Sequence, residues 1–180
     1  MKNILIELAS RSIRDELENS VTVNKHSLLH EHPEFNENRA TFVTLNLNGQ
    51  LRGCIGSLLP HRNLIDDIVQ NAKAAAFQDP RFLPLSKEEF EEVEIELSLL
   101  SVPKPLEYSS IDDLKSKVSI GKDGVILRLD GYQATFLPQV WEQLPTFELF
   151  FNHLCQKAGL SGGCLAEHPE ISLYQVEKIT

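Results

Sequence analysis

The chain has 180 residues, of which 42% are hydrophobic and 24% are charged, a composition typical of a globular protein with its own core. Its net charge of -9 argues against a nucleic-acid partner, because phosphates require a basic surface and no useful run of lysine or arginine occurs. No stretch reaches the roughly 20 apolar residues of a membrane span, and Glu7 and Arg11 interrupt the apolar start too early for a signal peptide. These features predict a cytoplasmic protein with neither a nucleic-acid nor a membrane partner.

The N-terminal third is expected to hold one helix and one long connection. Apolar residues three and four apart predict an amphipathic helix that ends near Glu18. Residues 24–38 are polar, contain three histidines and show no period, so we expect a connection there.

The segment around Asn48 and Gly49 predicts a β-hairpin with two compatible registers. A two-residue loop would mix polar and apolar side chains on both faces. A three-residue loop with a bulge at Gly49 pairs Leu45 with Leu51 and gathers the apolar residues on one face. Consistent patterning favours the second register. The opposite face of the strand pair would then hold Thr44, Arg52 and Cys54.

The middle of the chain carries clear helix and strand signals. Asn63 is expected to cap a helix over 64–78 that starts with two aspartates, and an extended segment with two prolines follows it. Ser86 and Glu89 form a predicted capping box of a short helix. Alternating apolar and polar residues over 93–99 predict a half-exposed antiparallel strand.

The last third predicts a second hairpin between two helices and a final strand. Residues 109–117 are typical of a short capped helix, and Asp130-Gly131 marks the hairpin turn. An apolar helix ending at Gly159 and a strand over 171–179 complete the chain. Hairpins and helices without repeated βαβ units indicate an α+β fold, with a largely antiparallel sheet flanked by helices.

Cys54 is the first candidate for chemistry. A neighbouring guanidinium, that of Arg52, would favour the thiolate, and the flanking Gly53 and Gly56 would let a ligand approach the backbone closely. A nucleophile also needs a base, and the nearest in sequence is His61, in a loop. The alternative is a small side chain packed between glycines. Both interpretations remain open.

Arg52, Asp79 and Arg81 form a second candidate, for ligand binding. Two arginines near a segment held by prolines could bind a carboxylate or phosphate through their planar forks. The alternative is an ion pair between Asp79 and Arg81 that fixes the turn after the helix. No phosphate loop or established catalytic motif occurs in the sequence.

The three cysteines are Cys54, Cys155 and Cys164, an odd number without a C-x-x-C pair. This predicts reduced thiols rather than a disulfide framework. His153 and Cys155, with Cys164 and His168, offer ligand types for zinc, but residues two apart on a helix point away from each other. We therefore expect Cys155 to pack in the core, and we predict no metal and no cofactor.

Several motifs, taken in order, resemble those of one family. They are "FVTLNLNGQLRGCIGSL", "NAKAAAFQDPRFLPL", "VEIELSLLSVPKPL", "GKDGVIL", "FLPQV" and "FFNHLCQKAGL". They are similar to the AMMECR family, whose bacterial and archaeal members are also called AmmeMemoRadiSam system protein A. The resemblance runs from about residue 40 to the C-terminus and is weaker over 1–39, and we expect one AMMECR domain over 1–180.

This resemblance implies an α+β fold with a larger and a smaller subdomain and a cleft near the "LRGCIG" strand. It assigns no reaction and no role to the motif residues, which here are Arg52–Gly56 and Asp79–Phe82. Prokaryotic members are associated by gene neighbourhood with Memo-like proteins and radical S-adenosylmethionine enzymes, so it implies these as partners. Two functions stay open: an enzyme or accessory protein acting on a small molecule, or a non-catalytic module that docks on those partners.

Overall fold

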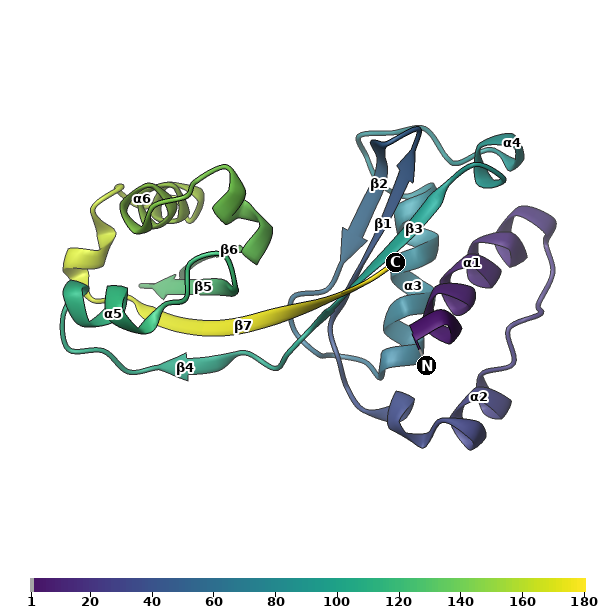
Figure 1. Ribbon diagram of the computed structural model, residues 1–180, viewed down its shortest axis with the longest axis horizontal. Helices are drawn as coiled ribbons and strands as arrows, with labels where there is room; N and C mark the ends of the chain where they lie inside the picture. Colours follow the sequence, from purple (N-terminus) through teal and green to yellow (C-terminus); the bar gives the residue numbers. More distant parts are fainter. Residues whose placement is uncertain (1) are drawn as a thin grey trace. The chain divides into compact units, whose positions relative to one another are not determined.

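The computed structural model describes residues 2–180, so Met1, where the expected domain begins, lies outside the described residues. The chain divides into two units, which Figure 1 shows in sequence colours. Unit 1 comprises the chain up to Leu100 together with Glu177–Thr180, and unit 2 comprises Ser101–Val176. Both units combine helices with antiparallel strands, which confirms the predicted α+β class with a larger and a smaller subdomain.

Unit 1 is a sheet covered by helices. Its elements are α1 (Lys2–Glu18), α2 (Lys25–Glu31), the 3-10 helix η1 (Pro33–Asn36), β1 (Thr41–Leu47), β2 (Gln50–Gly56), α3 (Leu64–Phe77), α4 (Lys87–Phe90), β3 (Glu94–Leu100) and the end of β7 (Glu170–Ile179). The strand order is β2-β1-β3, and the end of β7 follows β3. Within the described chain, β2 is therefore the outermost strand of this order.

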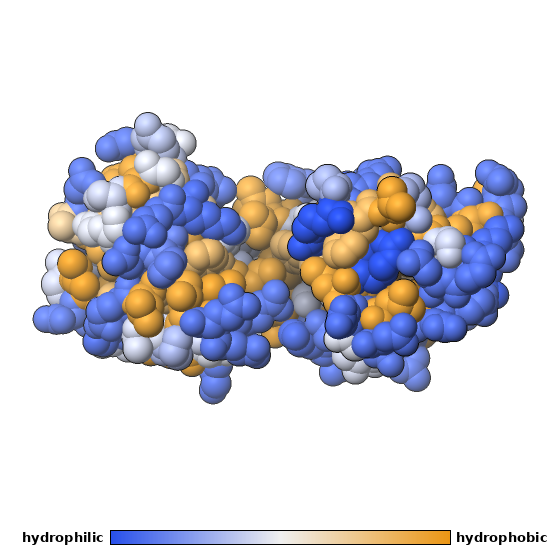
Figure 2. Space-filling model, turned by 90° about the horizontal axis from the view of Figure 1, so that it is seen from above, coloured by the Kyte–Doolittle hydropathy of each residue, from blue (hydrophilic) through white to orange (hydrophobic). Residues whose placement is uncertain are grey.

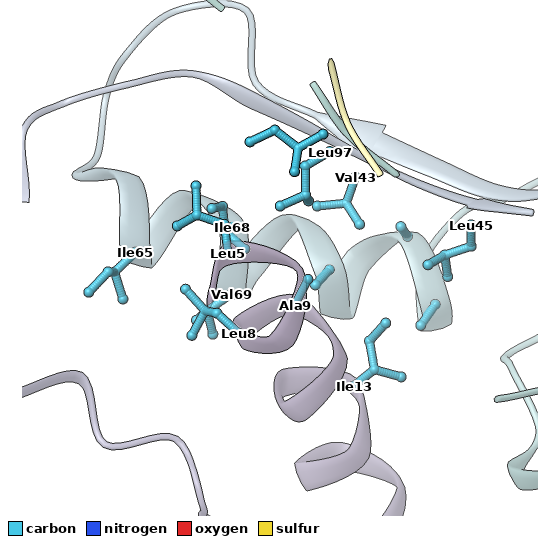
Figure 3. Packing of buried hydrophobic residues seen from close by; sticks show 14 of the residues in the cluster. Leu5, Leu8, Ala9, Ile13, Val43, Leu45, Ile65, Ile68, Val69 and Leu97 are labelled. Carbon is cyan, nitrogen blue, oxygen red and sulfur yellow. The ribbon is translucent and has the colours of Figure 1, made fainter. Parts of the chain in front are cut away.

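The core of unit 1 lies where α3 packs on β1 and β2, with α1 packed against α3. Figure 3 shows the contributing side chains from α1 (Leu5, Leu8, Ala9, Ile13), β1 (Val43, Leu45), α3 (Ile65, Ile68, Val69) and β3 (Leu97). Alanines on the inner face of α3 allow close approach to the sheet. Burial of each large aliphatic side chain contributes about 1.5–3 kcal/mol, so this cluster is the main source of stability in the unit.

Local capping signals in unit 1 are confirmed. The side chain of Asn63 accepts a hydrogen bond from the Asp66 amide at 2.9 Å, at the start of α3. Ser86 and Glu89 form both hydrogen bonds of the capping box that begins α4. Each cap satisfies helix-end amides that the helix itself leaves without partners.

The prediction of a plain connection over 24–38 is wrong, because this segment contains α2 and η1. Asn24 caps α2 by accepting a hydrogen bond from the Ser27 amide at 3.0 Å. Phe35 anchors η1 in the core. Two turns of helix are too short to show a helical period, which is why the pattern gave no signal.

A buried carboxylate fastens α3 to the start of β1. Asp67 is fully buried and accepts hydrogen bonds from the Thr41 amide and hydroxyl at 2.8 and 2.7 Å and from Asn71 at 2.9 Å. Ser57 donates to its other oxygen at 2.8 Å, and Arg62 pairs with that oxygen at 2.8 Å. A buried charge is tolerated only with such full pairing. The helix dipole explains an aspartate in the first turn of α3, as the sequence predicted, but nothing in the sequence indicated that Asp67 is buried.

Unit 2 is a second antiparallel arrangement. Its elements are β4 (Lys104–Leu106), α5 (Ile111–Lys117), β5 (Asp123–Leu129), β6 (Tyr132–Phe136), η2 (Pro138–Glu142), α6 (Phe147–Lys157), η3 (Cys164–Glu167) and the first part of β7. The strand order is β4-β7-β5-β6. The predicted hairpin turn is confirmed, with Asp130 and Gly131 both at positive φ (49° and 84°).

An aromatic cluster forms the core of unit 2. Trp141 stacks on Phe150 of α6 with ring centroids 3.6 Å apart, and its indole N–H donates to the Asp123 carbonyl at 2.8 Å. Phe147 and Phe151 continue this face of α6. The cluster buries the apolar side of the helix that the sequence predicts.

The prediction of reduced thiols is wrong for two of the three cysteines. Cys155 at the end of α6 and Cys164 in η3 form a disulfide, and both are fully buried. Nine positions separate them, and Gly159 in the left-handed conformation lies between them, where the chain leaves α6. The spacing matches no C-x-x-C motif, so only the fold brings the sulfurs together.

Reduction of this disulfide should destabilise the protein. Closure of so short a loop stabilises a protein by about 3 kcal/mol through the entropy of the unfolded chain. Urea unfolding of a Cys54→Ser variant, with and without phosphine reductant, measures the effect without interference from the third thiol. Identical unfolding curves, with mass spectrometry confirming reduction of the Cys155–Cys164 bond, would contradict the expectation.

Candidate functional site

The hairpin register at β2 differs from both predicted alternatives. Asn48 and Gly49, at φ 53° and 75°, form a two-residue turn. Leu45 pairs with Gly53 while the next residue of β1 pairs with Leu51, so Arg52 is an extra residue in a bulge. The three-residue loop with its bulge at Gly49 is therefore wrong.

The bulge decides which side chains of β2 face the core. Beyond it, Ile55 pairs with Val43 and packs against the core cluster, whereas Cys54 pairs with Thr44. Leu51, on the turn side of the bulge, is 41% exposed. It is therefore not part of the apolar face, contrary to the prediction. Cys54 does lie away from that face, as the sequence indicated.

The two glycines beside Cys54 are accounted for by packing. Gly53 is buried, and a Cβ there would lie 2.1 Å from the carbonyl oxygen of Ala75 in α3. A Cβ on Gly56 would lie 2.2 Å from the ring of Phe42. Gly53 is thus not open to the close approach of a ligand that the sequence analysis expected. Its role is to let β2 approach α3.

Asp79 occupies the free backbone edge of β2 at Cys54. Its buried carboxylate accepts a hydrogen bond from the Cys54 amide at 2.9 Å. Arg81 binds the same carboxylate through Nε at 3.0 Å and Nη2 at 2.7 Å, and Nη2 also donates to the Cys54 carbonyl at 3.4 Å. The ion pair therefore replaces, for one residue, the neighbouring strand that β2 lacks on this side.

The charges of this pair stabilise each other. Hydrogen bonds from Arg81 hold the pKa of Asp79 well below its ordinary value of 3.8, and the Cys54 amide adds to this although burial opposes it. The hydrogen bond to Asp79 likewise raises the pKa of Arg81, although burial opposes this shift. The Arg81 side chain is nevertheless half exposed, next to the Cys54 backbone.

Arg52 is held by a different carboxylate. It forms two parallel hydrogen bonds of 2.8 Å to Glu89, and its Nη2 donates to the Leu83 carbonyl at 2.9 Å. Its Nη1 is buried and has no hydrogen-bond partner among residues 2–180. The guanidinium carbons of Arg52 and Arg81 lie 5.7 and 5.5 Å from the ring centre of Phe82, within cation–π range.

The Cys54 thiol is free and half-buried, and it lies 3.3 Å from the hydroxyl of Thr44. No carboxylate or imidazole is hydrogen-bonded to the thiol in the described part of the chain. His61, the base nearest in sequence, is exposed on its loop. The geometry therefore presents a thiol without the base that activates a cysteine nucleophile in a dyad.

The sequence signals placed Arg52, Cys54, Asp79 and Arg81 together but missed Glu89. Glu89 was recognisable only as part of a capping box, because its second role depends on a residue 37 positions away. Phe82 lay within a recognised motif, yet nothing in the sequence indicated that both arginines approach its ring. The structure thus makes the two motifs parts of one surface on unit 1. On the face of the protein that Figure 2 shows, strongly hydrophilic residues lie beside hydrophobic ones.

Cys155 and Cys164 are bonded to each other, so their sulfurs are not available as thiolate ligands. Across residues 2–180, no three histidine, cysteine, aspartate or glutamate side chains converge in a way that could hold a metal ion. None of the helices described is long and apolar enough to cross a membrane.

The fold and site define an α+β protein whose antiparallel sheet carries a cysteine at an edge strand closed by an Asp–Arg pair. The chain belongs to the AMMECR1 family, whose sequence profile matches residues 6–179. A protein of Methanothermobacter thermautotrophicus is 36% identical over 96% of this chain and 89% of its own, and one of Methanosarcina acetivorans is 39% identical over 79% and 72%. The crystal structure of the uncharacterized protein PH0010 from Pyrococcus horikoshii matches with a TM-score of 0.82 and 32% identity, over 97% of this chain and 88% of that one.

Gly53→Ala should destabilise unit 1 by about 1–3 kcal/mol, since its Cβ would overlap the α3 backbone. Gly163→Ala is the matched control, because Gly163 has φ -91° and its Cβ would meet no atom within 4 Å. The control should change stability by less than about 0.5 kcal/mol. Urea unfolding measures both, and equal effects would refute the packing role of Gly53.

Glu89→Gln should remove an acid-sensitive part of the stability. Hydrogen bonds from Arg52 lower the pKa of Glu89 from 4.5 to about 2. The carboxylate therefore stabilises the fold above pH 4.5, and this contribution disappears as the pH falls towards 2. We expect a loss of about 1–2 kcal/mol at pH 7, reduced by partial solvent screening, and convergence with the parent protein near pH 2.

Glu91→Gln is the control for this pH series, because Glu91 is exposed on the same segment. Unfolding free energies measured between pH 7 and pH 2 give the comparison. A Glu89→Gln deficit that stays constant over this range would show that the ion pair is not its origin.

Proposed function

We propose that this protein is an enzyme or accessory protein that acts on a small anionic molecule at Cys54. The supporting observation is a free, half-buried thiol on a strand whose backbone Asp79 and Arg81 hold in place. We further propose that it works as a single AMMECR domain in the cytoplasm, in a pathway with Memo-like and radical S-adenosylmethionine proteins. The family resemblance supports a pathway with these proteins, and the free thiol of Cys54 supports a reaction at that residue.

The preference for an anion follows from the charge of Arg81, which lies beside the Cys54 backbone. Arg81 uses Nε and Nη2 for Asp79, yet its side chain is 54% exposed and keeps a positive face towards solvent. Such a face attracts a carboxylate or phosphate group. Because no base among residues 2–180 is hydrogen-bonded to the thiol, its proton would pass to solvent. The sulfur would then displace a leaving group from an electrophilic carbon: the C–S bond forms as the bond to the leaving group breaks, and the leaving group departs with that electron pair.

Alkylation kinetics test the reactivity of Cys54. Iodoacetamide should modify Cys54 in the native protein at a rate within about tenfold of that in urea, since the thiol is half-buried rather than enclosed. Mass spectrometry of peptides locates the label, and Cys54→Ser gives the background. Modification that occurs only after unfolding would exclude a reactive role.

The charge of Arg81 is tested with two reagents of similar size. Arg81→Gln should lower the rate with anionic iodoacetate relative to neutral iodoacetamide by about two- to fivefold, because a nearby positive charge is lost. Lys122→Gln removes one charge from an exposed lysine of unit 2 and should leave the ratio unchanged. An unchanged ratio in Arg81→Gln would refute selection for anions.

A second candidate is a non-catalytic module that docks on the same partners. Its supporting observation is the apolar surface near the site: Leu83 is 83% exposed and Leu51 is 41% exposed, while both arginine forks are filled by carboxylates of the chain itself. Leu83→Glu should then abolish co-purification with a Memo-like or radical enzyme and leave the alkylation rate of Cys54 unchanged. Absence of any complex with the parent protein, even after crosslinking, would eliminate this candidate.

A further inference from the structure

The sulfur of Cys54 has one hydrogen-bond partner among residues 2–180, the hydroxyl of Thr44 at 3.3 Å. A free cysteine thiol has a pKa of about 8.5, so only a few per cent of it is thiolate at pH 7. The proposed reaction needs the thiolate. The groups that surround the sulfur therefore decide how much of it can react.

Strand pairing fixes Thr44 beside Cys54. The two residues lie directly opposite each other in β1 and β2, beyond the bulge at Arg52, so their side chains project from the same face of the sheet. The amide and carbonyl of Cys54 point away from β1, because they bond to Asp79 and Arg81. Cys54 and Thr44 are therefore a non-hydrogen-bonded pair, the type in which opposite side chains lie closest.

This face of the sheet lies opposite the apolar core. The neighbours of Thr44 along β1, Val43 and Leu45, are fully buried in the core of unit 1. Thr44 and Cys54 are both only half-buried, so solvent reaches the pair.

The direction of the hydrogen bond between the two side chains depends on the charge of the sulfur. With a neutral thiol, either the S–H or the O–H can donate. A thiolate has no proton, so only the Thr44 hydroxyl can then donate. A hydrogen bond received by the charged form favours that form, which lowers the pKa of the thiol.

The charged side chains around this pair are neutralised by one another. Glu96 of β3 lies directly opposite Thr44 on the same face, and its negative charge would oppose a thiolate. Lys178 of β7 pairs with Glu96 at 3.2 Å and offsets this charge. These paired charges largely cancel, which leaves the Thr44 hydroxyl as the group that distinguishes the thiolate from the thiol. The charged groups beside β2 are paired in the same way: Asp79 with Arg81, and Glu89 with Arg52.

We propose that Thr44 is a positioning residue for Cys54: its hydroxyl donates a hydrogen bond to the sulfur and stabilises the thiolate that reacts. The sulfur releases its proton to solvent, and Thr44 keeps its own proton throughout, so it does not act as a base. This role rests on the proposed function, because it concerns the reactivity of the same thiol. It explains how a thiol without a paired base is ionised enough to react at neutral pH.

The pH dependence of Cys54 alkylation in the full-length protein tests this role. Rates with iodoacetamide are measured between about pH 6 and about pH 10 for the parent protein and for Thr44→Val, which keeps the shape of the side chain and lacks the hydroxyl. The midpoint of the profile, at which half of the thiol is ionised, should rise by about one pH unit in Thr44→Val.

The two profiles should cross. At pH 7 the rate of Thr44→Val should be about threefold lower, because a tenfold smaller thiolate fraction is partly offset by the greater nucleophilicity of a more basic sulfur. Above both midpoints, where both thiols are ionised, the variant should react about threefold faster.

Thr44→Ser is the matched control, since it keeps the hydroxyl and should restore the parent midpoint. Thr44→Ala also lacks the hydroxyl and should raise the midpoint as Thr44→Val does, so it replaces the valine variant if that variant does not fold. Urea unfolding shows whether each variant is folded at the pH values used.

An unchanged midpoint in the variants without the hydroxyl would overturn the role of Thr44. A rate that falls by the same factor at every pH would also overturn it, because such a change reflects access to the thiol and not its ionisation. A native Cys54 that iodoacetamide does not modify in the parent protein refutes the proposed function and this role with it. A reactive Cys54 with an unchanged midpoint refutes only the role of Thr44.

Discussion

The hydrogen bond from the Cys54 amide to the Asp79 carboxylate is the contact on which the surface around β2 depends. An outermost strand exposes backbone donors and acceptors that would otherwise pair with water or with another chain. Asp79 accepts a hydrogen bond from the backbone amide of Cys54, and Arg81 donates one to its carbonyl. In the adjacent bulge, Arg52 forms a salt bridge with Glu89. Side chains therefore hold the backbone that carries the thiol, and no base among residues 2–180 is hydrogen-bonded to the sulfur.

The arginines of the two units are used differently. Around β2, the guanidinium groups of Arg52 and Arg81 bind carboxylates within the same unit, which stabilises the turn after α3 and the start of α4. At the β5–β6 hairpin, Arg128 is oriented by the side-chain amide of Gln133 and forms no salt bridge among residues 2–180. The carboxylates fix the positions of Arg52 and Arg81, and only the exposed part of Arg81 stays accessible to a ligand.

Local signals predicted most elements, because their causes lie within a few residues. Asn63 and Ser86 cap the helices that follow them, and Asp130-Gly131 forms the expected turn. The misses have equally definite causes. The helix at 25–31 is too short to show a helical period. The bulge at Arg52 combines the two-residue turn, in which Leu47 pairs with Gln50, with the pairing of Val43 and Ile55 beyond it, and no register without a bulge gives both.

The sequence by itself determined the α+β class, the family and the two motifs that carry Cys54 and Asp79. Only the tertiary structure decided which groups meet, because their partners are 25 to 37 residues apart: the Cys54 amide with Asp79, and Arg52 with Glu89. It also joined two cysteines that the sequence predicted to be reduced. Local propensity acts over single turns, while hydrogen bonds and disulfides between distant segments form only where packing of the core has already brought their backbones together.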